Sequence, residues 1–225
     1  MAIAKETWFE IRKGAIFEVA IEDVPSDLLK TRFPNFKDEK ELTLLLATLP
    51  DLILNNLFVL QEDSEGKGGT DVLGVTEEGQ LVVVETKSSI VNALALGQAL
   101  GYAVYLDKEP KKLLPQILKF ENHIAEKYLE IISRGTKVDE MPIVVVASKS
   151  ISVTLMELFK YLGENMGEAN FTILPMSYGC WKIPDSDICY VCRRIHEYEK
   201  EAPVRWNDWN VGDVAENMGT DTDCD

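Results

Sequence analysis

The sequence predicts an α/β protein with a central mixed β-sheet that helices cover on both faces. Three observations lead to this class: two apolar strands surround a short turn within residues 70–87, a helix–strand–helix–strand order follows them, and 46% of the 225 residues are apolar. That apolar content fills the core of one ordinary domain, which we expect over residues 1–196. Residues 197–225 are acidic, and we expect a mobile or partner-binding tail there.

The other elements follow from periodicity and from helix breakers. Leucines at helical spacing predict an amphipathic helix over 38–48, and Pro50 follows where that helix should stop. We expect further strands at 57–61, 142–148 and 171–176, and further helices at 90–106, 112–133 and 151–165. Because Pro175 has no N–H to donate to a ladder, we expect the last of these strands to lie at an edge of the sheet.

The two paired strands have a register that the turn between them sets. A three-residue turn at 77–79 ends on a glycine, which supplies the left-handed conformation that such turns commonly need. Pairing then runs from Val75 opposite Leu81 back to Asp71 opposite Glu85. Directly opposed residues have Cβ atoms ~5 Å apart, so both carboxylates are close enough to share one cation.

Acidic and basic groups gather at the end of this hairpin. Because side chains alternate across a sheet, Asp71, Glu85 and Lys87 share one face. Carboxylates are hard oxygen ligands of the kind that Mg²⁺ (or Mn²⁺) prefers, so we expect a metal site at Asp71 and Glu85 that includes Thr86. Lys87 would orient the attacking water or stabilise the charge on a phosphate. The alternative is a strand-end ion pair between Lys87 and one carboxylate.

The next helix adds a pattern that points to a family. Gln98 and Tyr102 lie four residues apart in GQALGYAVYL, one turn apart on one face of a helix. Together with DVLGV and EEGQLVVVETK, this pattern resembles the PD-(D/E)xK nuclease superfamily, most like its NucS-type and RecB-type nuclease branches. The resemblance covers residues 39–106.

The resemblance implies a restriction-endonuclease-like fold and assigns roles to the hairpin residues. It makes Asp71 and Glu85 metal ligands, Lys87 catalytic, and one glutamate of the first helix an assisting residue. Glu39 is favoured over Glu41 for that role, since it precedes a leucine of the apolar stripe by three positions. Gln98 and Tyr102 are supporting residues of the same site.

The chain also departs from the family pattern. Gly69-Thr70 stands where the NucS-type branch often has a basic residue before its aspartate, so a contact to substrate phosphate is missing or comes from elsewhere. Residues 1–37 and 140–225 carry no motif that matches the family.

We therefore expect a metal-dependent nuclease that hydrolyses phosphodiester bonds of DNA, with endonuclease action preferred. The alternative is a catalytically silent nuclease-fold module that acts through protein contacts, for which the acidic tail is a candidate. A homodimer that cuts both strands stays open. Net charge is −15, which argues against broad nonspecific attraction to nucleic acid, and the basic stretch from Lys108 to Lys137 reads as a solvated helix face.

Two further groups of residues are weaker candidates for function. Cys180, Cys189, Cys192 and His196 could supply four zinc ligands, but buried reduced thiols are the commoner outcome. For Trp181, Trp206 and Trp209, packing or a protein contact is favoured over stacking on unpaired bases. Lys5 and Glu6 interrupt any secretory apolar core, and no apolar run is long enough to span a bilayer, so cytoplasmic residence is the default expectation.

Overall fold

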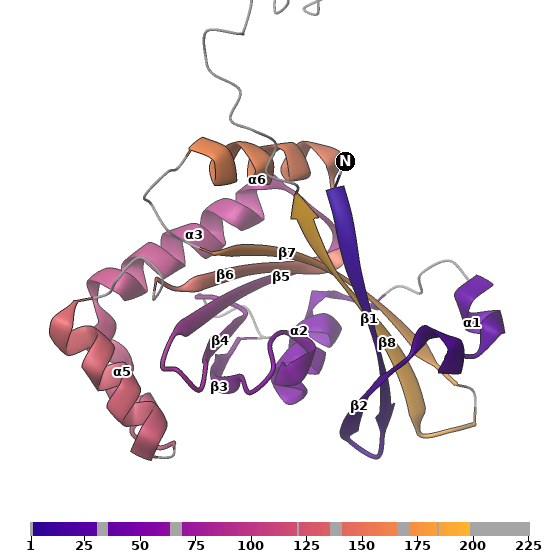
Figure 1. Ribbon diagram of the computed structural model, residues 1–225, viewed down its shortest axis with the longest axis horizontal. Helices are drawn as coiled ribbons and strands as arrows, with labels where there is room; N and C mark the ends of the chain where they lie inside the picture. Colours follow the sequence, from indigo (N-terminus) through magenta and orange to yellow (C-terminus); the bar gives the residue numbers. More distant parts are fainter. Residues whose placement is uncertain are drawn as a thin grey trace, which may run out of the picture.

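A single β-sheet organises the part of the chain that the structure describes. The structure is a computed structural model, and it describes residues 2–30, 36–63, 69–120, 122–135, 141–165, 172–183 and 185–198. Eight strands within these residues form one sheet in the order β2-β1-β8-β7-β6-β5-β4-β3 (Figure 1). The strands are β1 (Ala2–Arg12), β2 (Ala15–Val19), β3 (Phe58–Glu62), β4 (Val72–Val75), β5 (Leu81–Val91), β6 (Ile143–Ile151), β7 (Ile173–Lys182) and β8 (Ile188–Tyr198).

The sheet is mixed, as the sequence predicts. β5, β6 and β7 pair in parallel, and the five other neighbouring pairs are antiparallel. The helices are α1 (Ser26–Lys30), α2 (Glu39–Thr48), α3 (Ala93–Lys108), α4 (Leu114–Ile117), α5 (Asn122–Arg134) and α6 (Val153–Asn165), with 3-10 turns η1 (Ile21–Asp23), η2 (Pro50–Leu52) and η3 (Pro110–Leu113). Parallel strands in the middle of the sheet need helical crossovers, which α3 and α6 provide.

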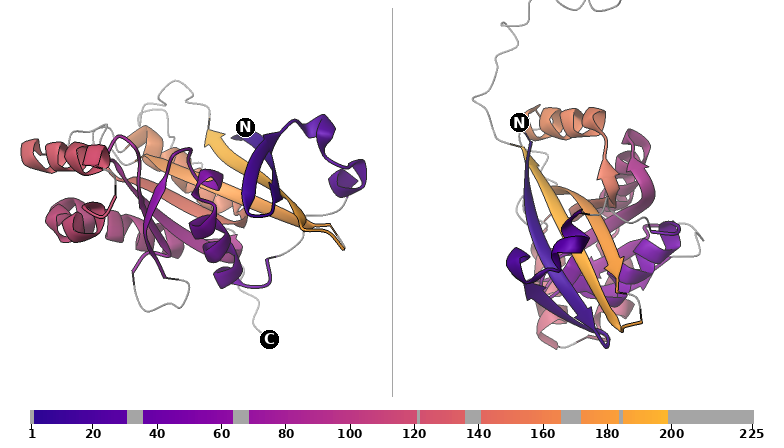
Figure 2. Two further views of the ribbon diagram at one scale, coloured as in Figure 1. Left: turned by 90° about the horizontal axis from the view of Figure 1, so that it is seen from below. Right: turned by 90° about the vertical axis from the view of Figure 1, so that its right-hand side faces the viewer.

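Helices cover both faces of the sheet, which confirms the predicted fold class. Val83 and Val144 face a core with α3, α5 and α6, whereas Val82 and Val145 face a second core with α2. Figures 1 and 2 show α2 on the opposite side of the sheet from α3 and α6. Because alternate residues of each central strand enter different cores, these strands read as continuous apolar runs rather than alternating ones.

The predicted hairpin between β4 and β5 is confirmed in its turn and its register. Val75 pairs with Leu81, and the Gly79 N–H donates to the Thr76 carbonyl at 2.9 Å. Gly79 has φ of +84°, and a Cβ there would lie 2.7 Å from the backbone nitrogen of Tyr128 in α5. The glycine therefore permits both the turn and the close approach of α5.

The first predicted helix is confirmed, and its start is fixed by a cap. The Asp38 side chain accepts a hydrogen bond from the Glu41 N–H at 2.9 Å, which satisfies a free donor of the first turn. The helix ends at Thr48, before Pro50. This cap sets where α2 presents its first-turn side chains.

Two other helix predictions were wrong at their boundaries. The helix expected from residue 90 begins later, because β5 continues to Val91 and the Asn92 side chain caps α3. The single helix expected over 112–133 is instead η3, α4 and α5. Pro115 lies in the first turn of α4, where its missing N–H costs nothing, but it could not continue a helix begun at residue 112.

The edge position expected for the strand at 171–176 was also wrong. β7 lies between β6 and β8, and it runs to Lys182. Pro175 pairs with Val146 of β6, while the pairing with β8 begins only at Met176. An internal strand accepts the proline because, at that residue, only one neighbour requires hydrogen bonds.

The N-terminal region forms strands that no motif indicated. β1 and β2 are joined by Lys13 and Gly14, with φ of +52° and +77°, the left-handed pair that tight hairpins need. β1 then pairs with β8 along its whole length. Trp8 stacks on Trp181 at 5.0 Å between ring centroids, so Trp181 packs within the fold; Trp206 and Trp209 lie outside the described residues.

The predicted tail lies outside the described residues except for its first two, which end β8. The domain boundary at residue 196 therefore stays a prediction. Among the described helices, none is both long and apolar enough to cross a membrane.

Candidate active site

Charged side chains gather where β5 leaves its apolar half. Val82, Val83 and Val84 are fully buried, and Glu85, Thr86 and Lys87 follow them directly. The pairing of β5 with β6 shifts by one residue between Lys87 and Ile90. A bulge of this kind bends a strand and re-aims its side chains, so β5 turns just after the lysine.

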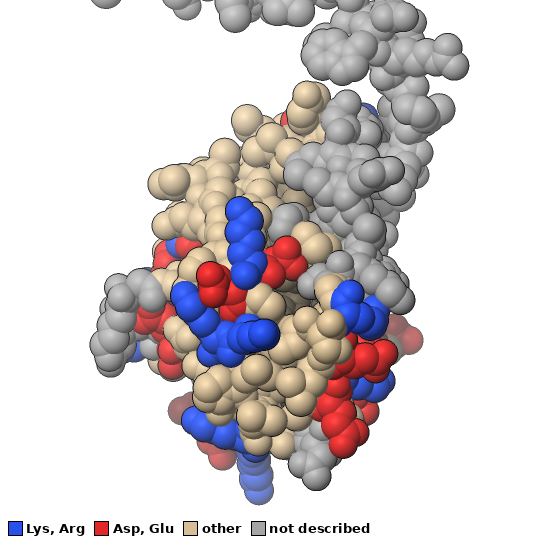
Figure 3. Space-filling view, turned by 90° about the vertical axis from the view of Figure 1, so that its left-hand side faces the viewer, with Lys and Arg blue, Asp and Glu red and all other residues tan. Residues whose placement is uncertain are grey.

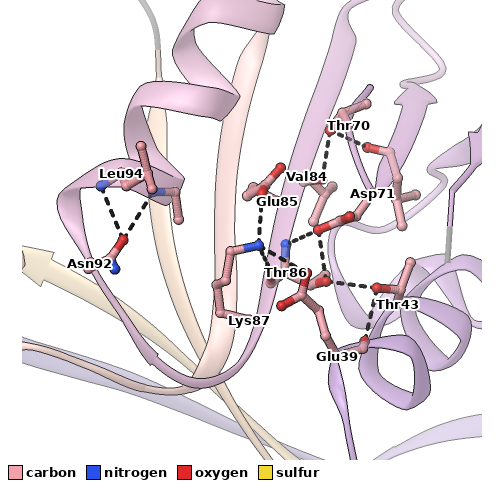
Figure 4. Close-up of polar contacts among 12 residues, drawn as sticks. Glu39, Thr43, Thr70, Asp71, Val84, Glu85, Thr86, Lys87, Asn92 and Leu94 are labelled. Carbon is pink, nitrogen blue, oxygen red and sulfur yellow. Dashed lines mark hydrogen bonds and ion pairs between the residues drawn. The ribbon is translucent and has the colours of Figure 1, made fainter. Parts of the chain in front are cut away.

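The Lys87 ammonium binds three oxygen atoms from two elements. Nζ lies 2.8 Å from Glu85 Oε1, 3.0 Å from Glu39 Oε1 of α2 and 2.7 Å from the Thr86 carbonyl oxygen (Figure 4). The lysine side chain is 27% exposed, so the ammonium is reachable from solvent. The lysine thus joins the middle of β5 to the first turn of α2.

Asp71 is held by Thr86, the residue between Glu85 and Lys87. Its Oδ2 accepts the Thr86 N–H at 2.6 Å and the Thr86 hydroxyl at 2.9 Å. The carboxylate that meets Lys87 beside Glu85 is therefore that of Glu39, while the Asp71 carboxylate turns toward Thr86 (Figure 4). Within the described residues, no hydrogen-bond donor contacts the second oxygen of Asp71.

Two buried threonines extend this arrangement into α2. The Thr86 and Thr43 hydroxyls lie 2.7 Å apart, and Thr43 Oγ1 is 3.0 Å from the Glu39 carbonyl oxygen. An ionised Asp71 can only accept, so Thr86 gives it its single proton and Thr43 must donate to Thr86. The proton of Thr43 is then shared with the Glu39 carbonyl, which links Asp71 to the start of α2. Sequence reasoning missed Thr43, although a lone polar residue within a leucine run was a usable signal.

The site has more negative than positive charge. Glu85 and Glu39 bind the Lys87 ammonium, and Asp71 adds a third carboxylate nearby through Thr86, so the cluster has three acidic groups for one lysine among the described residues. Burial raises the pKa of Glu85, and the charges of Asp71 and Glu39 raise it further against the hydrogen bond from Lys87. Burial lowers the pKa of Lys87, but its bonds to Glu85 and Glu39 outweigh that effect and the pKa is raised. Such a cluster favours binding of an added cation.

The two glutamates of the first turn of α2 lie differently. Glu39 reaches Lys87, whereas Glu41 accepts the Lys37 N–H at 2.7 Å and contacts Lys182 Nζ at 3.1 Å. These bonds lower the pKa of Glu41. Only Glu39 of this pair therefore belongs to the cluster around the lysine.

The two residues of the following helix lie at some remove from this cluster. Gln98 is exposed on α3, and within the described part of the chain it makes no hydrogen bond to Asp71, Glu85 or Lys87. Tyr102 is half-buried, and its hydroxyl lies 3.5 Å from the place a Cβ on Gly69 would take. Burial, the largest cause, raises the pKa of Tyr102. Tyr102 thus borders the approach to β4.

The donor atoms of the cluster match a hard divalent cation. Among the described residues, no three His, Cys, Asp or Glu side chains are grouped so as to hold a metal. The carboxylates of Asp71 and Glu85 with the Thr86 carbonyl oxygen nevertheless form an all-oxygen set that suits Mg²⁺, which keeps several waters. The Lys87 ammonium already contacts two of these three donors, so a bound cation would compete with it.

The four possible zinc ligands do not meet. Cys180 and Cys189 have sulfur atoms 2.9 Å apart, but Cys192 lies in another cluster with Trp8 and His196 Nε2 contacts the Ser177 hydroxyl at 2.8 Å. A tetrahedral zinc site needs all four within about 2.3 Å of one point. The cysteines are free thiols.

The basic stretch lies at the opposite end of β5 from Lys87. Gly79, at the turn end of β5, approaches the backbone of Lys127 in α5. Figure 3 looks at this end of the molecule and shows Lys and Arg side chains mixed with acidic ones rather than a continuous basic surface. This mixture agrees with a solvated helix face.

The fold and the site together define an α/β protein with an acid–lysine cluster on a central strand. No family model and no curated protein matches the chain. A search of solved structures finds similarity to one described as "Structure of EndoMS-dsDNA2 complex", with 16% identity and a TM-score of 0.39. The match covers 77% of this chain and spans 65% of the other. A TM-score of that size carries no argument, so the case for function rests on the residues around Lys87.

Proposed function

We propose that this protein is a metal-dependent nuclease that hydrolyses phosphodiester bonds of DNA, with endonucleolytic cutting preferred. The observation that carries the proposal is the acidic cluster on β5: Glu85 and Glu39 both bind the partly exposed Lys87 ammonium, and the nearby Asp71 carboxylate is held by Thr86 between them. Structural ion pairs usually balance their charges. Carboxylates gathered beside an apolar stretch are costly unless they are paired or bind a cation, which supports a cation site here.

Each residue has a role in the proposed reaction. Asp71, Glu85 and the Thr86 carbonyl would hold Mg²⁺ or Mn²⁺, which lowers the pKa of bound water and offsets charge on the phosphate. Lys87 would orient the attacking water or stabilise the charge that builds on the phosphate oxygens. Glu39 holds Lys87 in place, and we assign Gln98 and Tyr102 to the side of the site that meets the substrate.

The test is cleavage of labelled single-stranded, duplex and branched DNA with Mg²⁺ or Mn²⁺. We expect Asp71→Asn, Glu85→Gln and Lys87→Met each to lower the rate by about 100-fold or more, as loss of a charge-stabilising group does. Glu41→Gln is the matched control, because Glu41 lies in the same turn of α2 as Glu39 but binds Lys182. Cleavage that survives all three site substitutions would remove these residues from the reaction.

Lys87→Met also separates the roles of metal and lysine. Since the ammonium contacts Glu85 and the Thr86 carbonyl, its removal should strengthen Mn²⁺ binding while it abolishes cleavage. Calorimetric titration of Mn²⁺ into the wild type and the variant measures the first effect. Weaker binding in Lys87→Met would contradict competition between the ammonium and the metal.

One observation favours a second function, that of a catalytically silent interaction module. The Lys87 ammonium bridges Glu85, Glu39 and the Thr86 carbonyl, an arrangement that stabilises this strand end without any metal. The discriminating measurement is calorimetry with Mn²⁺ on wild type and Asp71→Asn. Binding that Asp71→Asn abolishes supports the nuclease, and the absence of site-dependent binding supports the module.

A further inference from the structure

The sulfur atoms of Cys180 and Cys189 lie close together on neighbouring strands. Cys180 is in β7 and Cys189 in β8, and their sulfurs are 2.9 Å apart. A disulfide bond is about 2.05 Å long, so less than about 1 Å of motion would bring the two sulfurs into bonding range. Both side chains are partly exposed, which leaves them open to a small oxidant.

The register makes this pair a reversible rather than a permanent crosslink. Cys180 pairs with Val191, and Cys189 pairs with Lys182, so the two cysteines are diagonal rather than directly opposite. Diagonal positions on paired strands are farther apart than disulfides prefer, and bonds that depart from the preferred geometry are more easily reduced. The strands have to shift to form the bond, and they shift back when it is reduced.

The surroundings assign different parts to the two thiols. The two thiols share one hydrogen bond, in which either sulfur can donate. Lys182 pairs directly opposite Cys189, so its ammonium favours the thiolate there, and the pKa of Cys189 is lowered by the shared hydrogen bond and by this positive charge. Cys189 is therefore the thiolate that attacks and Cys180 the thiol that resolves. Cys192 offers an internal comparison, because it is fully buried and burial raises its pKa to about 12.

We propose that Cys180 and Cys189 are a redox-modification site that low-molecular-weight disulfides oxidise to an intramolecular disulfide. The Cys189 thiolate attacks a sulfur of oxidised glutathione, and one glutathione thiolate leaves. Cys180, no longer donating to a thiolate, loses its proton and attacks Cys189, and the second glutathione leaves. The protein gives up two electrons and two protons, and one oxidised glutathione becomes two reduced molecules.

The location connects this site to the first turn of α2. Both thiols pack against the core that α2 covers, and Lys182, which pairs across from Cys189, binds Glu41. Glu41 lies two residues from Glu39 in that turn. A strand shift at the thiol pair would reach the helix that holds Glu39. The thiol chemistry itself needs neither DNA nor a metal, so it stands apart from the proposed nuclease activity.

The test uses the full chain with Cys224→Ser, so that only three thiols remain. The folded protein is treated with oxidised glutathione, quenched with N-ethylmaleimide under denaturing conditions, and analysed by intact mass and peptide mapping. We expect a Cys180–Cys189 linkage, a single alkylated site at Cys192, and full reversal by dithiothreitol. A linkage that includes Cys192, or a lasting glutathione adduct on Cys189 while Cys180 is present, would overturn the proposal.

Three single variants in that background fix the order of events. Cys180→Ser should stop at a stable glutathione adduct on Cys189, and Cys189→Ser should react at least about 10-fold more slowly, since no thiolate is poised to attack. Cys192→Ser should form the same disulfide as the parent. Equal reaction rates in Cys180→Ser and Cys189→Ser would contradict the assigned parts, and circular dichroism confirms that each variant is folded.

Discussion

The apolar and the charged parts of β5 show how one strand serves stability and chemistry separately. Residues 81–84 are apolar and buried against helices on both faces, and the turn before them is locked against α5 at Gly79. The next three residues carry two charges and a buried hydroxyl, and the strand bulges directly afterwards. The apolar half fixes where the charged half must lie, so the charged half need not stabilise the fold.

The strongest test of this comparison places a charged side chain in the apolar part of β5 and an apolar side chain in the charged part. Val83→Glu puts a carboxylate into a fully buried position with no partner, and we expect it to cost about 4 kcal/mol or more of unfolding free energy. Glu85→Val, two residues along on the same face, should change stability by less than about 1.5 kcal/mol while it removes Mn²⁺ binding. Urea denaturation and calorimetry measure the two quantities, with Val83→Ala as the control for lost volume.

The turn end should be sensitive to a single methyl group. Gly79→Ala would combine a positive φ with a Cβ 2.7 Å from the Tyr128 nitrogen, and we expect it to cost about 3 kcal/mol. Gly14→Ala shares the positive φ, but nothing lies within 4 Å of its Cβ, so it should cost about 1 kcal/mol. Equal losses in thermal denaturation of the two variants would show that the contact with α5 contributes nothing.

At the charged end, the threonine hydroxyls should matter for metal binding more than for folding. Thr86→Val keeps the side-chain shape and the N–H bond to Asp71 but removes the hydroxyl donor to it, and we expect Mn²⁺ to bind about 10- to 100-fold more weakly. Thr86→Ser should restore binding, and Thr43→Val should have a smaller effect. Thr70→Val is the matched control, since the buried Thr70 hydroxyl donates to the Val84 carbonyl instead. If Thr70→Val loses as much Mn²⁺ affinity as Thr86→Val, the cause is a general loosening of the fold.

The smallest expected effect is a pH dependence at Glu85. Because its pKa is raised in the folded protein, ionisation of Glu85 opposes folding, and the stability that its neutral form contributes is lost as the pH rises through the raised pKa. Glu85→Gln removes this loss, so the variant should gain stability relative to wild type as the pH rises just above the usual range for glutamate. Denaturation of both proteins across that range checks the sign; a constant difference would contradict it.

The sequence was sufficient for the region where local rules act alone. The turn at 77–79, the register of Val75 with Leu81 and the cap of α2 all depend on residues near each other in the chain. The contact of Glu39 with Lys87 depends instead on how α2 packs across the sheet, and no local pattern specifies it. The same limit explains why Thr43 and the thiol pair emerged only from the structure.

The predictions for helix boundaries and strand order were wrong where a tertiary contact decided between two local preferences. Residues 90 and 91 have apolar side chains that suit either a helix or a strand, and pairing with Ser150 and Ile151 of β6 keeps them extended. β7 was placed at an edge because of Pro175, yet β8 pairs with β7 only from Met176 onward, which removes the conflict. Neither outcome can be read from propensity, because each depends on how far the pairing with a distant strand extends.

The pairing of β1 with β8 has a consequence for synthesis on the ribosome. β1 finds its main partner only when Ile188–Tyr198, the last of the described strands, has left the exit tunnel. Until then the β1–β2 hairpin has an unpaired long edge, of the kind that invites wrong association. The outer edge of β1 should therefore gain protection from hydrogen exchange only after all the other described strands have been synthesised.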